Sequence, residues 1–182
     1  SWEAARDYYE PLSTLMFLAG KTTDIRLGIS ILVISYRNPI TTAKMLSTID
    51  SLCGGRIFIG VGTGWWEDEF NPLGIGNHFS ERGVRTDEYI NIFRNLWTEE
   101  NPEFNGRFFS YRNLEFSPKP VQKKGIPIWI GGPNLDWRSH KASFKARGRT
   151  RRCMASDWSQ APSQPGSRRI RQMQRGALLY RT

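Results

Sequence analysis

The residues best suited to hold a ligand form a glycine-rich loop, Gly60-Val-Gly-Thr-Gly64, with Trp65-Trp66 directly behind it. Glycines let the backbone approach a phosphate closely, and successive backbone N–H groups make a concavity that holds an anion. The loop follows Arg56–Val61, a short β-prone stretch. It predicts a phosphate-binding turn at the carboxyl end of a parallel strand, where α/β folds bind ligands. Glycine turns after strands are common, so the loop alone does not establish a site. At least one of the two tryptophans is predicted to pack in the core.

Strands and a helix around this loop form a βαβ unit. Residues 24–35 are a nearly continuous apolar run, which predicts a strand covered on both faces. Asn38-Pro39 marks the start of a helix and Gly54-Gly55 its end, so residues 39–52 are predicted to be helical. The other predicted elements are helices at 2–18, 66–73 and 80–97, the last capped by Ser80, strands at 56–61 and 126–130, and a hairpin at Asn105-Gly106.

Strands that alternate with helices predict a parallel α/β fold. Three interior strands cannot close an eight-stranded barrel, which takes about 250 residues. The sheet is therefore either open and small or part of something larger. The start at Ser1, within a predicted helix, favours the second alternative.

The basic charge of the chain is confined to its end. Residues 1–133 hold 14 Lys/Arg against 15 Asp/Glu, whereas residues 134–182 hold 12 against 2, which together give the net charge of +9. We therefore divide the chain into an α/β domain, 1–133, and a basic tail of low order, 134–182. The tail offers arginines and tryptophans to a nucleic acid, but no recognition fold accompanies them, so nucleic-acid binding is disfavoured.

Neither the cysteines nor the histidines have the spacing of a metal site. Cys53 and Cys153 are predicted to be free thiols, and His78 and His140 lie in polar loops. No signal peptide is recognisable, and no apolar run approaches the roughly 20 residues that span a bilayer. These features predict a cytoplasmic protein without a membrane partner or a metal.

Several motifs, in the same order, resemble the luciferase-like monooxygenase superfamily, and most closely its branch that uses the deazaflavin coenzyme F420. They are Asp24-Ile-Arg-Leu-Gly-Ile-Ser-Ile-Leu-Val33, Tyr36-Arg-Asn-Pro39, Ser51-Leu-Cys-Gly-Gly-Arg56, Gly60–Trp65 and Pro127-Ile-Trp-Ile-Gly-Gly132. The resemblance runs from about Tyr8 to Pro133. It implies part of a (β/α)8 TIM barrel, which lacks its first strands here and diverges after residue 133.

The resemblance also implies a cofactor, either coenzyme F420 or, as the alternative, FMN. The cofactor would serve hydride transfer or oxygen activation on a small organic substrate. The positions that correspond to its binding site are Ser30, Ile31, Asn38, Gly62, Thr63, Gly64, Gly131 and Gly132. Among these, Ser30–Ile31 corresponds to a non-prolyl cis peptide beneath the ring, and both glycine turns correspond to contacts with the phosphate arm. A homodimeric parent enzyme is compatible with the resemblance.

No acid–base residue follows from the resemblance. In some deazaflavin enzymes a glutamate follows the Gly-Thr-Gly turn, but here that position is Trp65. The nearest carboxylates, Glu67–Glu69, are predicted to be a solvated first helical turn. Arg82 and Arg85 either form surface ion pairs or contact the anionic tail of the cofactor.

The family pattern stops at Asn134, and two interpretations of the tail besides nucleic-acid binding follow. One is an extension without function. The favoured one is a shifted reading frame, because the codons of Met154-Ala155, Asp157-Trp158 and Trp158-Ser159, read one base later, encode Trp, Ile or Thr, and Gly, which gives Trp-x-x-[Ile/Thr]-Gly. That peptide is similar to the Trp-His-x-Ile-Gly of family members. The alternative to an active oxidoreductase is an inactive fragment, whose open sheet edges would favour aggregation.

Overall fold

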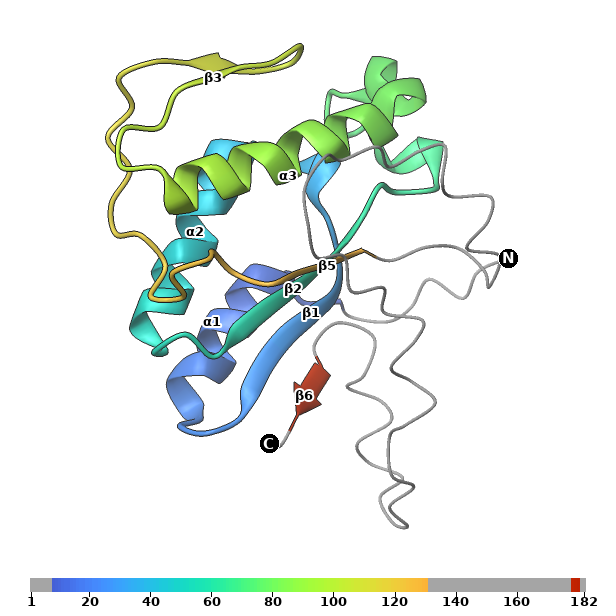
Figure 1. Cartoon of the computed structure of the whole chain (residues 1–182). Helices are drawn as coiled ribbons and strands as arrows, with labels where there is room; N and C mark the ends of the chain where they lie inside the picture. The colour runs from blue at the N-terminus through green and yellow to red at the C-terminus, as the bar shows by residue number, and fades with distance from the viewer. Residues whose placement is uncertain (1–7, 131–177, 181–182) are drawn as a thin grey trace, which may run out of the picture.

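The computed structural model describes residues 8–130 and 178–180, and a four-stranded sheet lies at its centre (Figure 1). Three strands run parallel in the order β5-β2-β1: β1 (Arg26–Val33), β2 (Ile57–Gly62) and β5 (Ile128–Ile130). β6 (Leu178–Tyr180) pairs antiparallel with the other side of β1. The predicted parallel α/β fold is confirmed. The strand β6 was not predicted from the sequence. The rest of the tail lies outside the described residues.

Helices pack beside one another against this sheet. α1 (Pro11–Lys21) contacts β1 and α2 (Pro39–Leu52), and α3 (Arg82–Thr98) packs on α2 (Figure 1). The short 3-10 helices are η1 (Ile34–Tyr36), η2 (Glu67–Glu69) and η3 (Gly76–Glu81). The hairpin is formed by β3 (Phe104–Asn105) and β4 (Ser110–Tyr111), and it folds back along α3.

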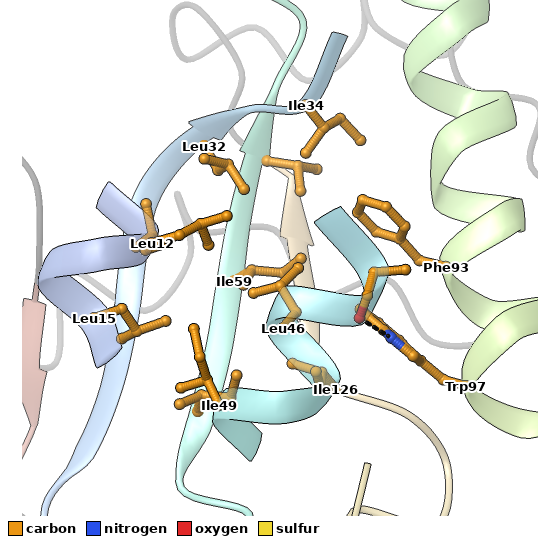
Figure 2. Packing of buried hydrophobic residues seen from close by; sticks show 14 of the residues in the cluster. Leu12, Leu15, Leu32, Ile34, Leu46, Ile49, Ile59, Phe93, Trp97 and Ile126 are labelled. Carbon is orange, nitrogen blue, oxygen red and sulfur yellow. Dashed lines mark hydrogen bonds between the residues drawn. The ribbon is translucent and has the colours of Figure 1, made fainter. Parts of the chain in front are cut away.

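The core lies between the sheet and the helices, as Figure 2 shows. Leu15 of α1, Ile59 of β2 and Leu46 of α2 are fully buried there. Trp97 of α3 donates its indole N–H to the backbone oxygen of Ala43 at 3.1 Å, which joins α3 to α2. Because each large side chain contributes about 1.5–3 kcal/mol on burial, this cluster fixes the sheet against its helices.

Local signals at both ends set the bounds of α2. The Asn38 side chain accepts a hydrogen bond from the backbone N–H of Thr41 at 3.0 Å, and Pro39 takes the first helical position. Gly54 and Gly55 follow the helix with φ of 70° and 82°, a conformation that glycine adopts without strain. The predicted helix at 39–52 is confirmed at both ends.

Arg56 ties the start of β2 to the end of α1 and the strand that follows. All five of its guanidinium N–H groups reach oxygens, at 2.8–3.0 Å. The acceptors are the backbone oxygens of Ala19, Thr22, Ile25 and Cys53 and the hydroxyl of Thr22. A planar fork of donors suits this set of diverging acceptors, which lysine could not serve in full.

Several predicted bounds are wrong. α1 begins at Pro11, where Glu10 caps it, and residues 8–10 are not helical. The predicted helix at 66–73 is only the short turn η2 followed by further turns, because this stretch buries little besides Phe70. Ser80 does not cap α3, since it lies within η3 and the helix begins at Arg82 without a side-chain cap.

Candidate functional site

The carboxyl ends of β1 and β2 lie side by side and point toward η2, η3 and the start of α3 (Figure 1). Leu32 pairs with Val61 and Val33 with Gly62, but the register shifts between Ile29 and Leu32. The peptide bond at this shift, Ser30–Ile31, is cis. The cis peptide expected from the resemblance is therefore confirmed, next to the strand that carries the glycine loop.

Gly64 is required by its backbone conformation, and Gly62 leaves room for the Ile31 side chain. A Cβ atom at Gly62 would collide with the Cδ1 atom of Ile31, which is 40% exposed and lies across the strand end. Gly64 has φ of +80°, and a Cβ atom there would lie 3.1 Å from the Phe70 ring and 3.1 Å from the Tyr36 hydroxyl. The absence of side chains at these two positions lets Ile31 and Tyr36 approach the loop.

The loop is fixed from both sides by side chains. Ser35 donates its hydroxyl to the backbone oxygen of Thr63 at 3.0 Å. Arg82 donates its Nε–H to the backbone oxygen of Gly64 at 3.1 Å and an Nη1–H to that of Phe79 at 2.8 Å. Its guanidinium also lies 4.0 Å from the centre of the Phe79 ring. Arg82 is therefore engaged in holding the loop in place.

Arg85, one turn further along α3, has a different environment. It is 8% exposed, and its Nη2–H donates to the Tyr89 hydroxyl at 2.6 Å. The guanidinium carbon lies 5.4 Å from the centre of the Tyr89 ring and 4.9 Å from that of the Phe108 ring. Its Nε atom is buried without a hydrogen-bond partner, and none of the ion pairs among the described residues includes it. A buried charge without a counter-ion is unfavourable, so this position suits an anion.

Tyr36 and Glu69 form a hydrogen bond beside the loop. The Tyr36 hydroxyl donates to Oε2 of Glu69 at 2.5 Å, and the Tyr36 ring contacts the Phe70 ring edge-on. Burial, together with this hydrogen bond and the negative charge of Glu69, raises the pKa of Tyr36 above its usual value. Glu69 remains exposed, as predicted for the acidic turn, but it is also bound to a residue that contacts the loop.

The two tryptophans after the loop are both outside the core. Trp65 is 72% exposed and Trp66 is 46% exposed, and their rings stack with centres 6.0 Å apart. The prediction that at least one of them packs in the core is wrong, because the chain turns outward after Gly64 into η2. The stacked pair lies directly beyond the carboxyl end of β2.

The structure brings together some of the predicted site residues. Ser30, Ile31, Gly62, Thr63 and Gly64 all lie at the adjoining ends of β1 and β2. Asn38 is exposed and uses its side-chain oxygen to cap α2, so no contact with the loop is found for it.

The second glycine turn, Gly131-Gly132, lies outside the described residues. The strand that leads to it, β5, places Ile130 beside Val61 of β2. Tyr36 and Glu88 were not predictable as site residues, because each acts through a contact with a residue at least 19 positions away.

No group of three or more His, Cys, Asp or Glu side chains within the described part of the chain is placed to hold a metal ion. No helix in this part is long and apolar enough to cross a bilayer.

Comparison with protein families gives a match that covers most of the chain. The model of the luciferase-like monooxygenases matches residues 1–138. An uncharacterized protein of Mycobacterium tuberculosis is 36% identical over 115 residues, which are 63% of this chain and 38% of the relative. The FMNH2-dependent dimethylsulfone monooxygenase of Pseudomonas putida is 36% identical over 96 residues, which are 52% of this chain and 26% of the relative.

Solved structures show the same fold. The monooxygenase RslO1 from Streptomyces bottropensis superposes with a TM-score of 0.63 and 25% identity, over 69% of this chain and 40% of that one. The coenzyme F420-dependent tetrahydromethanopterin reductase from Methanopyrus kandleri superposes with a TM-score of 0.57 and 23% identity, over 68% and 39% of the two chains. The chain thus spans about two fifths of the length of these proteins.

Proposed function

Because this chain belongs to the luciferase-like monooxygenase family, we propose that it is part of a flavin- or deazaflavin-dependent oxidoreductase that acts on a small organic substrate. The observation that carries the proposal is Arg85, which is buried one helical turn after Arg82, the residue that contacts the glycine loop, and has no counter-ion among the described residues. Arginine matches the geometry of a phosphate, and both cofactors carry phosphate.

We propose that such a cofactor binds along the adjoining ends of β1 and β2. The adjoining strand ends at Ser30–Ile31 would support its ring, and the backbone of Gly62–Gly64 would face its phosphate arm with Arg85 as the charged partner. When bound, the cofactor supplies the redox chemistry, either hydride transfer or oxygen activation, and the protein orients and shields it. We assign no acid–base residue. We also propose Gly131 and Gly132, which lie outside the described residues, as a second phosphate-binding turn.

We propose coenzyme F420 as the cofactor, with FMN as the alternative. The set of motifs between Asp24 and Gly132 resembles the F420 branch most closely, although Trp65 stands where some deazaflavin enzymes carry a glutamate. The relatives and solved structures include proteins named for each cofactor. Fluorescence titration of the full chain with both cofactors tests the choice. Arg85→Met should weaken binding of the preferred cofactor by about 10–100-fold, since a charged hydrogen bond contributes about 1.5–3 kcal/mol. Binding of neither cofactor would favour the inactive fragment.

A control separates Arg85 from basic charge in general. Arg94 lies on the same helix, is half-buried, and has no side-chain hydrogen bond or ion pair among the described residues. Arg94→Met removes the same charge, so it should leave the affinity unchanged. Equal weakening by both substitutions would mean that cofactor binding depends only on net charge, and would refute the assignment of Arg85.

Asn38 provides a second test, because its two proposed roles use different atoms. Its side-chain oxygen caps α2, and its NH2 group would be the one to contact the cofactor. Asn38→Asp keeps a good capping oxygen and removes the donor, whereas Asn38→Ala also removes the cap and costs about 1 kcal/mol of stability. We expect Asn38→Asp to keep the melting temperature and lose affinity. Unchanged affinity would leave Asn38 as a helix cap only.

The remaining parts of the proposal concern the whole protein. We propose a cytoplasmic enzyme whose parent forms a homodimer, and residues 134–182 as the product of a shifted reading frame. Sequencing the encoding DNA beyond the Pro133 codon tests the last point, because a shifted frame should restore a further helix and strand. Light scattering tests the oligomeric state. Salt-sensitive retention on heparin that depends on residues 134–182 would instead support nucleic-acid binding.

A further inference from the structure

The turn of the β3–β4 hairpin is fastened to α3 by one carboxylate, that of Glu88. Its Oε1 atom accepts the backbone N–H groups of Phe108 at 3.0 Å and Phe109 at 2.9 Å, and Oε2 accepts that of Arg107 at 2.8 Å. A Cβ atom at Gly106 would lie 2.6 Å from this carboxylate, so the close approach depends on glycine. Three successive N–H groups around one carboxylate form a strong, directional anchor.

A second attachment holds the same turn to η3. The guanidinium of Arg107 pairs with the carboxylate of Glu81, which also lies 3.5 Å from Nδ1 of His78. The Phe108 ring is contacted by His78 at 6.4 Å between ring centres and by the Arg107 guanidinium at 5.1 Å. The turn is therefore held at two places, and both lie near the start of α3.

These attachments place Phe108 over Arg85. The guanidinium carbon of Arg85 lies 4.9 Å from the centre of the Phe108 ring, within the range of a cation–π contact. Glu88 lies three residues after Arg85, but no ion pair joins them, since the Glu88 oxygens face the turn instead. Arg85 therefore has no carboxylate partner among the described residues, and its side chain is enclosed by the rings of Phe108 and Tyr89.

We propose that Glu88 is a positioning residue for the anion at Arg85: it holds the hairpin turn so that Phe108 seats the guanidinium for phosphate. This inference rests on the proposed function, because it takes Arg85 as the phosphate partner. Glu88 itself does not touch the anion and acts through Phe108. A side chain held by packing and hydrogen bonds in its binding geometry loses less freedom on binding, which raises affinity.

Inorganic phosphate, titrated into the full chain, is the probe. The Arg85 Nε–H resonance in a 1H–15N spectrum reports both the affinity and the position of the guanidinium beneath the ring. Glu88→Gln keeps a side chain of the same shape but turns an NH2 group toward the N–H groups of the turn. It should weaken phosphate binding about tenfold and shift the Arg85 resonance before phosphate is added, as loss of one charged hydrogen bond implies.

Two matched controls separate positioning from general effects. Glu103→Gln makes the same change of charge at an exposed position just before the hairpin, and it should leave both readouts unchanged. Phe108→Leu removes the ring and keeps apolar cover, whereas Phe108→Tyr keeps the ring. We expect Phe108→Leu to behave like Glu88→Gln, and Phe108→Tyr to behave like the unchanged chain.

The outcomes separate this inference from the proposed function. Phosphate binding that needs Arg85 but is equally tight in Glu88→Gln, with an unshifted Arg85 resonance, overturns the inference and leaves the proposed function in place. No response of the Arg85 resonance to phosphate in the unchanged chain overturns both. If Glu88→Gln does not fold, the two Phe108 variants decide, because equal affinity in both would overturn the inference.

Discussion

Arg85→Met should weaken phosphate binding and leave the stability of the fold almost unchanged, because the side chain is buried without a counter-ion among the described residues. The substitution loses the hydrogen bond to Tyr89 and the ring contacts, which together contribute about 2–4 kcal/mol. It also relieves the desolvation of a buried charge, which includes the unsatisfied Nε–H group, at several kcal/mol. These contributions oppose each other, so we expect the free energy of unfolding to change by no more than about 1 kcal/mol.

An arginine that serves stability alone would behave differently. Removing one partner of a buried ion pair typically costs about 3–5 kcal/mol. For a chain of this size, about 1 kcal/mol corresponds to roughly 2–4 °C in melting temperature. The Arg85→Met variant should therefore melt within about 4 °C of the unchanged chain in phosphate-free buffer, whereas a structural arginine would lower the midpoint by about 10 °C.

The assay is thermal unfolding followed by circular dichroism, with and without phosphate. At a phosphate concentration 100 times its Kd, the unchanged chain should gain about 2.7 kcal/mol, while the Arg85→Met variant, with an affinity about 10–100-fold weaker, should gain only about 0.4–1.4 kcal/mol. Arg94→Met is the matched control and should gain as much as the unchanged chain. A loss above about 3 kcal/mol without phosphate, or equal stabilisation of both chains by phosphate, would refute the reasoning.

Three further substitutions test the framework that holds the site. Gly64→Ala forces a side chain onto a backbone with φ of +80° and against the Phe70 ring, so it should cost about 1–2 kcal/mol in a denaturant titration. Gly20→Ala, with open space around it, should instead stabilise α1 by up to about 1 kcal/mol. Arg56→Lys leaves several carbonyl groups without donors and should lower the free energy of unfolding by about 3 kcal/mol; a loss below about 1 kcal/mol would show that water replaces the guanidinium. Glu10→Gln tests the pH dependence. Burial opposes ionisation of Glu10, but hydrogen bonds from Ser13, Leu12 and Arg37 hold its pKa at about 2, below the usual 4.5. Its stabilisation is therefore present above pH 4.5 and lost as the pH falls toward 2. Because the side chain is 41% exposed, the variant should cost less than about 1 kcal/mol at pH 7, and unfolding curves should converge with the unchanged chain near pH 2.

The elements that were predictable carry their own signals at both ends. α2 has Asn38-Pro39 at its start and Gly54-Gly55 at its end, and each of these acts within a few residues along the chain. The start of α3 was misplaced because Ser80, a good capping residue, lies in a 3-10 turn that continues directly into the helix. This continuation depends on how Phe79 and Arg82 pack on the glycine loop. The loop is distant in sequence, so the residues around Ser80 do not predict it.

The hairpin was also predictable only in part. Asn105-Gly106 correctly indicated a hairpin, but the paired residues Asn105 and Ser110 enclose a turn of four residues, because Glu88 gathers the N–H groups of that turn. A glutamate in the middle of a helix gives no sign of this role, since its partners lie 19–21 positions further along the chain. The glycine loop was recognisable from its spacing, whereas its attachments were not.

The two arginines at the start of α3 were equivalent in sequence, and the fold distinguishes them. Arg82 donates hydrogen bonds to the backbone oxygens of Gly64 and Phe79, so its guanidinium holds the loop in place. Arg85 donates one hydrogen bond, to the Tyr89 hydroxyl, and contacts two aromatic rings. The carboxylate of Glu88, one turn further along the helix, faces the hairpin turn instead. A packing role would favour an apolar residue at this position, because a buried cation without an anion lowers stability. The retained charge is explained if the anion comes from a ligand, and the carboxyl ends of parallel strands, such as those of β1 and β2, are where α/β folds bind ligands.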